Sequence, residues 1–100
     1  LNSSNVVNMG SMFDGAVATT INGLNKLDTR NVTSMYLTFF NTKVSTLDLS
    51  SFDTSKVTNM NNMFSGTSAT IGYARNSAEA NKFNALSTSH KPENLKFTVK

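Results

Sequence analysis

The apolar positions of this chain repeat with a period of about 25 residues. A Val is followed by a Met three positions later and a Phe four positions after that, starting at Val6, Val32 and Val57. Self-similarity at such a period is typical of repeat proteins, in which each unit packs only on its neighbours. Leu1 stands in the slot that Leu27 fills ahead of the second copy, so we expect the chain to begin partway through a repeat.

A second motif lies between these copies and predicts short strands. Residues 44–49, Val-Ser-Thr-Leu-Asp-Leu, have the LxxLxL spacing of a leucine-rich repeat, in which alternate strand residues enter the core. Residues 68–73 keep two of the three apolar positions, and residues 18–24 keep the spacing only if Gly23 is an inserted residue. We therefore expect about three strands on one face. On the other face, the Val–Met–Phe spacing predicts a single α-helical or 3₁₀ turn in each repeat.

The length of the repeat indicates why the units must stack. One unit of about 25 residues buries too little apolar surface to offset the entropy lost when it is ordered. When units stack at the observed period, each unit covers the apolar side of the next one. It places like side chains above one another: Phe64 over Phe39 over Phe13, and Leu47 and Leu49 over Ile21 and Leu24.

The repeat ends after Tyr73, and the remaining residues predict a cap. Asn76, with Glu79 three residues later, is a capping box that opens a helix over residues 77–86. Residues 95–100 alternate apolar and polar positions, which is typical of a strand. A stack of repeats needs such an end, because its last layer would otherwise expose core and a free strand edge.

Together these elements predict an α/β fold. We expect a leucine-rich-repeat-like right-handed solenoid with short parallel strands and short helical turns over residues 1–73, in about three repeats, the first one truncated. A C-terminal helix-plus-strand cap is expected over residues 74–100. The N-terminal side of the first repeat is then expected to pack against preceding repeats of the same chain.

Residues 47–66, Leu-Asp-Leu-Ser-Ser-Phe-Asp-Thr-Ser-Lys-Val-Thr-Asn-Met-Asn-Asn-Met-Phe-Ser-Gly, closely resemble the repeat of the BspA-like bacterial surface proteins. Residues 72–99 are similar to the segment that often ends such arrays, whereas residues 14–24 depart from the pattern. The resemblance implies an exported protein of the cell surface or cell wall in Gram-positive bacteria or mycoplasmas, one that adheres to host or matrix molecules. It carries over no functional residue, because these proteins share no common binding motif.

Composition narrows the functional classes. The net charge is +3, but the 9 Lys and Arg residues are scattered, and a nucleic-acid binder gathers such residues on one surface. The chain has no Cys, which excludes disulfides and thiolate metal sites. No apolar run approaches the ~20 residues that span a bilayer. We therefore expect neither a nucleic-acid partner nor membrane insertion.

Few residues carry reactive chemistry. The only histidine, His90, is predicted to be an exposed loop residue without a catalytic partner. Asp28 and Asp53 would lie one repeat apart, and capping of their turns is favoured over a Ca²⁺ ladder, which needs six or more oxygens. The Met residues are interpreted as core filler, and Tyr36 either anchors a partner or packs between units. No nucleophile, base and acid form a recognisable set, so we predict no enzyme, no metal site and no cofactor.

If the chain binds a ligand, the outward residues of the strands are the best candidates. Leucine-rich repeats present this face as a concave sheet, and polar side chains repeated along it suit protein or glycan ligands. The candidate ligand-binding residues are Thr20, Asn22, Thr46, Asp48 and Thr70. We expect a non-catalytic extracellular interaction module that adheres to a host or matrix protein or to a glycan. The alternative is a passive spacer that holds other domains away from the cell wall.

Overall fold

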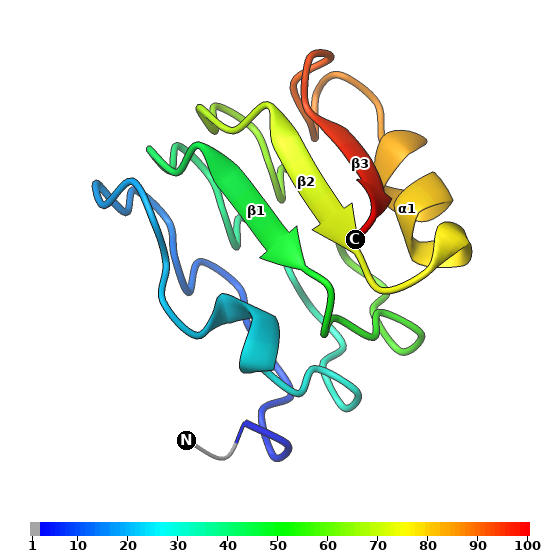
Figure 1. Ribbon diagram of the computed structural model, residues 1–100. Helices are drawn as coiled ribbons and strands as arrows, with labels where there is room; N and C mark the ends of the chain where they lie inside the picture. Colours follow the sequence, from blue (N-terminus) through cyan, green and yellow to red (C-terminus); the bar gives the residue numbers. More distant parts are fainter. Residues whose placement is uncertain (1–2) are drawn as a thin grey trace.

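The protein is a small α/β fold in which three parallel strands form an open sheet. The computed structural model describes residues 3–100, so the repeat position predicted at Leu1 lies outside the described residues. β1 (Thr46–Leu49), β2 (Ile71–Ala74) and β3 (Lys96–Val99) pair in the order β1-β2-β3 (Figure 1). A short 3₁₀ helix, η1 (Leu24–Lys26), precedes the sheet, and the helix α1 (Ser77–Asn84) lies between β2 and β3 in the chain.

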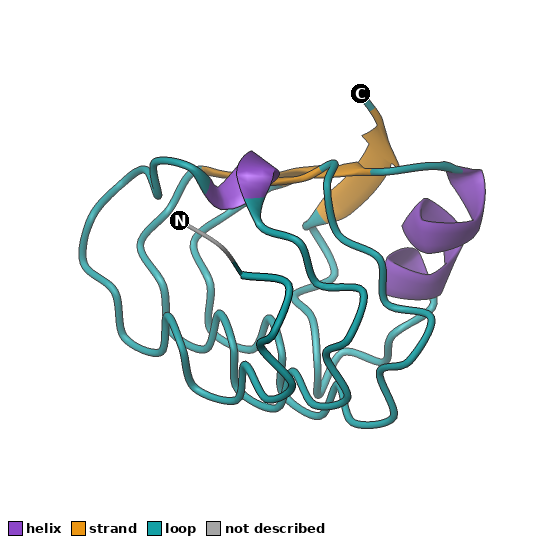
Figure 2. Ribbon diagram, turned by 90° about the horizontal axis from the view of Figure 1, so that it is seen from below, coloured by secondary structure: helices purple, strands orange, loops and turns teal. Residues whose placement is uncertain are grey.

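β1 alternates between buried and outward residues as the sequence pattern predicts, but β2 lies one residue out of the predicted register. Ile71 and Tyr73, expected at core positions, face outward, and Gly72 and Ala74 are buried instead. In β1, Leu47 and Leu49 are fully buried, while Thr46 and Asp48 face outward. Seen edge-on, the sheet lies along one side of the molecule and irregular loops fill the region beneath it (Figure 2). The predicted strands at 44–49, 68–73 and 95–100 overlap observed ones, with ends displaced by at most three residues.

Gly72 shows how β3 completes the third repeat. Its register partners are Leu47 on β1 and Phe97 on β3, so it holds a core position without a side chain. A Cβ atom on Gly72 would lie 2.4 Å from Cδ2 of Phe97, which is closer than real contacts permit. The Phe97 ring therefore fills the core slot that the repeat leaves empty, and only glycine fits beneath it.

The first repeat does not form a strand, contrary to the expectation for residues 18–24. Among the described residues, this region is irregular and leads into η1. Gly23 has φ of 80° and immediately precedes the 3₁₀ helix, so the extra residue turns the chain instead of forming a bulge in a strand. Leu24 still enters the core, with 5% of its surface exposed.

The Val–Met–Phe segments are turns, so the prediction of α-helical or 3₁₀ geometry there is wrong. Ser11, Leu37 and Asn62 hold equivalent positions in the three repeats, and all have φ between 55° and 60°. A left-handed residue interrupts a right-handed helix. The freed N–H groups bond to the neighbouring repeat instead: Phe13 N–H donates to the Thr38 carbonyl at 2.9 Å, and Phe39 N–H donates to Met63 at 2.9 Å.

The predicted column of phenylalanines is confirmed. The rings of Phe13 and Phe39 lie 5.4 Å apart and are nearly parallel, as are those of Phe39 and Phe64 at 5.8 Å. Phe83 of α1 and Phe97 of β3 then cover Phe64, with centroid distances of 5.7 and 5.2 Å. The column runs through all three repeats and ends against the C-terminal segment.

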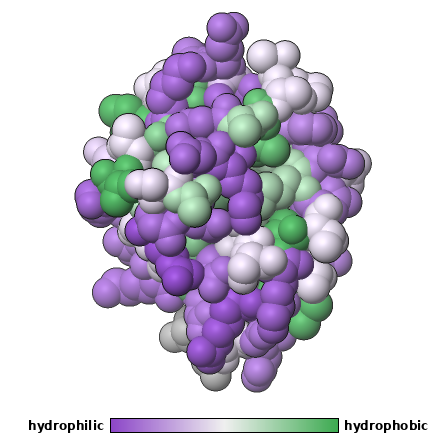
Figure 3. All heavy atoms as spheres, turned by 90° about the vertical axis from the view of Figure 1, so that its right-hand side faces the viewer, coloured by the Kyte–Doolittle hydropathy of each residue, from purple (hydrophilic) through white to green (hydrophobic). Residues whose placement is uncertain are grey.

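The C-terminal segment closes one end of the molecule. The side chain of Asn76 accepts a hydrogen bond from the N–H of Glu79 at 2.9 Å, so the predicted N-cap of α1 is confirmed. The side-chain amide of Asn84 donates to the Phe97 carbonyl and accepts from the Phe97 N–H, both at 2.9 Å. The face on the α1 side is mostly hydrophilic, with small separate apolar spots (Figure 3).

Candidate binding face on the sheet

The outward face of the sheet carries two rows of side chains set by the strand register. One row contains Thr46, Ile71 and Lys96, and the next contains Asp48, Tyr73 and Thr98. The first row is exposed, whereas Asp48 and Tyr73 are half-buried. Because parallel strands place successive repeats side by side, residues 25 positions apart become direct neighbours on this face.

Four of the five predicted ligand-binding residues line one shallow hollow. Its volume is about 290 Å³, and it lies where the first repeat meets β1. The residues that line it are Thr20, Ile21, Asn22, Gly23, Leu24, Asn25, Thr46 and Asp48. The fifth predicted residue, Thr70, is exposed but does not line the hollow. The hollow offers hydroxyl, amide and carboxylate groups in a small area.

Among the described residues that line this hollow, only Asp48 is charged, and its carboxylate accepts four hydrogen bonds. One oxygen accepts from the N–H of Ser50 at 3.1 Å and from its hydroxyl at 2.6 Å. The other accepts from the Asn25 amide at 3.3 Å and from the ammonium of Lys100. Burial alone would raise the pKa of Asp48, but the hydrogen bonds from Lys100 and Ser50 outweigh it and hold the pKa below its usual value.

Tyr73 and Lys100 belong to this face, although neither is among the predicted ligand-binding residues. The Lys100 ammonium forms an ion pair with Asp48. It also lies 5.6 Å from the centroid of the Tyr73 ring, a cation–π arrangement. Asp48 and Lys100 are 52 residues apart, so no local motif joins them. The strand order puts β2 between β1 and β3, so Lys100 reaches Asp48 across Tyr73 of β2. The sequence pattern predicted the strand at residues 95–100 without its place in the sheet.

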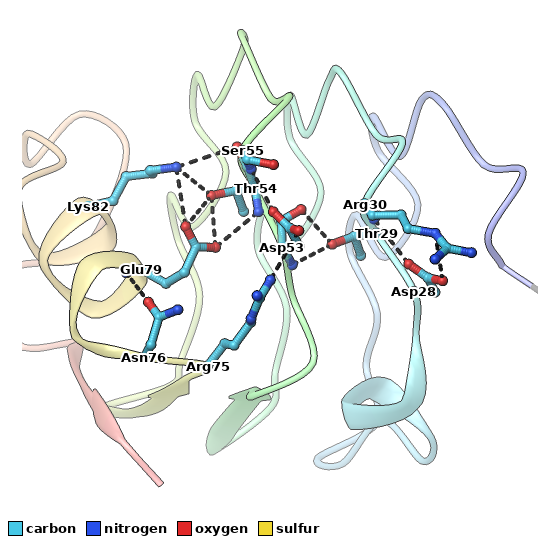
Figure 4. Close-up of polar contacts among 10 residues, drawn as sticks. All are labelled: Asp28, Thr29, Arg30, Asp53, Thr54, Ser55, Arg75, Asn76, Glu79 and Lys82. Atoms are coloured by element: carbon cyan, nitrogen blue, oxygen red, sulfur yellow. Dashed lines mark hydrogen bonds and ion pairs between the residues drawn. The ribbon is translucent and has the colours of Figure 1, made fainter.

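A second polar cluster runs along the Asp-Thr turns (Figure 4). Asp28 accepts from the N–H of Arg30 and Asp53 accepts from the N–H of Ser55, so both carboxylates cap their own turns as predicted. Each also forms an ion pair, Asp28 with Arg30 at 3.2 Å and Asp53 with Arg75 at 3.0 Å. Within residues 3–100, no three His, Cys, Asp or Glu side chains are placed to hold a metal ion.

Hydroxyl groups link these turns from one repeat to the next. Ser3 Oγ accepts from the N–H of Asp28 at 2.6 Å, and Thr29 Oγ1 accepts from the N–H of Asp53 at 2.8 Å. The Thr29 hydroxyl also donates to the Asp53 carbonyl at 2.9 Å. Thr29 is buried, with 1% of its surface exposed, so these bonds form where water does not compete.

The carboxylate of Glu79 ends this series. Sequence reasoning expected it to return to the N-cap of its own helix, but it accepts from the Thr54 N–H at 3.0 Å and from the Thr54 hydroxyl at 2.8 Å. Lys82, one turn along α1, forms an ion pair with Glu79 at 3.2 Å and donates to the Thr54 hydroxyl at 2.8 Å. Glu79 therefore accepts from the Thr54 hydroxyl as the Asp53 carbonyl accepts from that of Thr29, and Lys82 donates to it as the Asp53 N–H donates to Thr29.

His90 is not the exposed loop residue that we predicted. It is half-buried, its Nδ1 accepts from the N–H of Asn62 at 2.9 Å, and its carbonyl accepts from the N–H of Phe64 at 2.8 Å. In the preceding repeat, the equivalent N–H groups of Leu37 and Phe39 donate to carbonyls of the third repeat. His90 thus satisfies the turn of the last repeat, a structural role that its position in a polar loop concealed.

The methionines and Tyr36 divide between core and surface. Met9, Met35 and Met63 are buried, so the interpretation as core filler is confirmed for them. Met12 is 45% exposed and Tyr36 is 44% exposed. The Tyr36 side chain therefore stands at the surface, on the side of the molecule that carries the turns.

Comparison with known proteins identifies the family but adds no ligand. No curated protein and no solved structure is significantly similar to the chain. Among the described residues, no helix has the length and apolar character needed to cross a membrane. A family model matches residues 1–74, a stretch that spans the repeats and stops at the last residue of β2. The chain therefore belongs to the family described as "Mycoplasma protein of unknown function, DUF285".

Proposed function

We propose that this protein is a non-catalytic extracellular interaction module that binds a host or matrix protein or a glycan through the outward face of its sheet. The observation that carries the proposal is the hollow of about 290 Å³ between the first repeat and β1. The proposal includes export to the cell surface or cell wall, which the surface-repeat character of the sequence favours.

The proposed architecture is a leucine-rich-repeat-like right-handed solenoid of the BspA-like type. Support comes from the parallel register of β1 and β2 and from the parallel bridges Asn8–Ser34 and Ser34–Asn59 on the opposite face. These pairings place like residues of successive repeats side by side. Such an arrangement builds a continuous surface on which polar groups recur at fixed spacing.

The chemistry of the hollow suits a polar ligand. Asn22 and Asn25 supply amides that both donate and accept, while Thr20 and Thr46 supply hydroxyls. The outer oxygen of Asp48 is already shared by Asn25 and Lys100, so a ligand hydroxyl or amide would join an existing network. Binding sites that combine a few placed polar groups with some apolar wall are typical of specific recognition.

Binding to an array of glycans and matrix proteins tests this function. We expect a ligand that the wild-type chain binds and that the variant Thr46→Lys binds at least tenfold more weakly, because the longer side chain fills the hollow. Thr88→Lys, at an exposed loop position, is the matched control and should bind like the wild type. Equal binding by both variants would move the ligand away from the hollow. No binding to any array member would favour the spacer.

A further inference from the structure

The first repeat has a side that no other described part of the chain covers. A hollow of about 470 Å³ opens there, lined by Phe13, Ile21, Asn22, Gly23, Leu24, Lys26 and Leu27. Met12 is 45% exposed, although its counterparts Thr38 and Met63 are fully buried. Phe13 is partly buried, whereas Phe39 and Phe64 are fully buried. This side is therefore built from residues that the later repeats keep in the core.

The backbone of the first repeat shows the same asymmetry. Thr33 donates its N–H to the Val7 carbonyl at 2.7 Å and accepts from the Thr58 N–H at 2.9 Å. Ser45 likewise donates to the Thr19 carbonyl at 3.3 Å and accepts from the Thr70 N–H at 3.4 Å. The second repeat is thus bonded on both sides at these positions. Val7 and Thr19 are the equivalent residues of the first repeat, and their carbonyls bond to the second repeat.

We propose that this open side binds one further unit of the same repeat, an inference that uses the stacked architecture proposed above but not the ligand site. A Phe of the added unit would stack on Phe13, and its strand residues would cover Ile21 and Leu24. Its carbonyls would accept from the N–H groups of Val7 and Thr19. The ring stacking and the hydrogen bonds repeat those that the first repeat already makes to the second.

The structure favours a repeat unit over a second copy of this chain as the occupant. The added unit must present the side that the second repeat presents to the third. In this chain the corresponding side of the last repeat is taken by Glu79, His90 and Phe83. A second copy can therefore offer only its own open side, which carries the same half of the interface.

A fusion protein tests the inference. A copy of residues 27–51 is placed directly before Leu1, so that its last residue precedes Leu1 as Ser51 precedes Phe52. We expect hydrogen exchange at the amides of Val7 and Thr19 to slow at least tenfold relative to the parent chain. The Tm of the fusion should rise by about 5 °C or more, because the apolar hollow becomes buried.

A matched control carries Met35→Ser, Phe39→Ser and Leu47→Ser within the added copy only. It should leave both amides and the Tm at the values of the parent. Amides that exchange as fast in the first fusion as in the parent would overturn the inference. A parent chain that sediments as a dimer, with Val7 and Thr19 already protected, would also overturn it by assigning the open side to a second copy. Neither result depends on whether the sheet face binds a ligand.

Discussion

The first and the last repeat differ in how completely their core residues are covered. At the C-terminal end, the last repeat lies against α1 and β3, and Phe64, Met63 and Phe97 are almost completely buried. At the other end, Phe13 and Met12 are partly open to solvent. The first and last repeats follow the same Val–Met–Phe pattern, so the difference arises from what covers them and not from the repeats themselves.

The capped end shows which interactions a repeat needs from its neighbour. Glu79 and Lys82 supply to the Thr54 hydroxyl the acceptor and the donor that the Asp53 backbone supplies to the Thr29 hydroxyl. His90 supplies a ring nitrogen and a carbonyl to the turn of the last repeat. The C-terminal segment thus reproduces the polar contacts of a repeat with a different backbone. Burial of apolar surface alone would leave these donors without partners, which is costly in the interior.

The largest expected effect is the difference in stability between removing a phenylalanine from the middle of the column and removing one from its open end. We expect Phe39→Ala to lower the free energy of unfolding by about 3–5 kcal/mol, because a large cavity opens between Phe13 and Phe64. Phe13→Ala should cost only about 1–2 kcal/mol, because that ring is already partly hydrated. Urea denaturation measures both values. Equal losses would show that the middle of the column and its open end are equally well packed.

Removal of the Glu79 carboxylate should weaken the capped end next. We expect Glu79→Ala to cost about 2–3 kcal/mol, because the N–H and hydroxyl of Thr54 lose their acceptor in a buried place. Glu79→Gln keeps an acceptor and the shape, so about half of that loss should return. Glu93→Ala, at an exposed position, is the control and should leave stability unchanged. A Glu79→Ala variant as stable as the wild type would mean that the cap works through apolar contacts alone.

The loss of stability in acid should report the protonation of Asp53, in the Asp-Thr turn beside the C-terminal segment. The N–H of Ser55, with support from Arg75, lowers the pKa of Asp53 to about 2, below the value of about 3.9 in an unfolded chain. A depressed folded-state pKa stabilises the protein above the unfolded value, and this contribution is lost as the pH falls from about 4 to about 2. We expect a loss of about 1–2 kcal/mol from Asp53, after allowance for solvent screening of a partly exposed carboxylate.

Asp53→Asn is the matched variant for that titration. Asn keeps the turn, because its side-chain oxygen still accepts from the N–H of Ser55. The pKa of Asp48 is lowered as well, so both proteins lose that contribution in acid and the difference between them isolates Asp53. Thermal unfolding at pH 2, 3, 4 and 6 provides the comparison. Parallel curves for the two proteins would argue that the charge of the Asp53 carboxylate adds nothing to stability, whether through Ser55 or through Arg75.

The smallest expected effect lies in the turn of the middle repeat. Leu37 has φ of 60°, a conformation that strains a leucine, whereas its counterpart Asn62 tolerates it. We expect Leu37→Asn to raise the free energy of unfolding by about 0.5 kcal/mol, net of the apolar contact it gives up. Leu37→Val should lower stability, because a β-branched residue fits this region worse. A stabilising Leu37→Val variant would contradict the strain.

Much of this fold follows from periodicity, and the exceptions have local causes. The 25-residue spacing predicts the phenylalanine column, and alternation predicts the buried and exposed residues of β1, because both depend only on which residues are apolar. The turns were misassigned since Val57, Met60 and Phe64 have a helical spacing, while the left-handed φ of Asn62 decides the backbone. Gly23 similarly turned an expected strand into the start of η1.

The candidate site was predictable only in part. Thr46 and Asp48 were identified from strand alternation, and Thr20 and Asn22 from the repeat, and all four line the same hollow. Lys100 escaped notice because its position near Asp48 depends on the order of the strands. Tyr73 did so because the repeat pattern assigned it to a core position, whereas Gly72 and Ala74 hold the core positions of β2. Glu79 was identified with the wrong partner, because a capping box and a long-range acceptor have the same sequence pattern.

The side-chain amide of Asn84 covers part of the outer edge of the sheet. Lys96 donates its N–H to Thr70, so the N–H and carbonyl of its successor Phe97 point away from β2, and Asn84 occupies both. A free strand edge is a template on which another chain can polymerise. Because Asn84 occupies both outward groups of Phe97, another chain cannot pair with β3 at this residue, and the C-terminal edge of the sheet is protected there from strand addition.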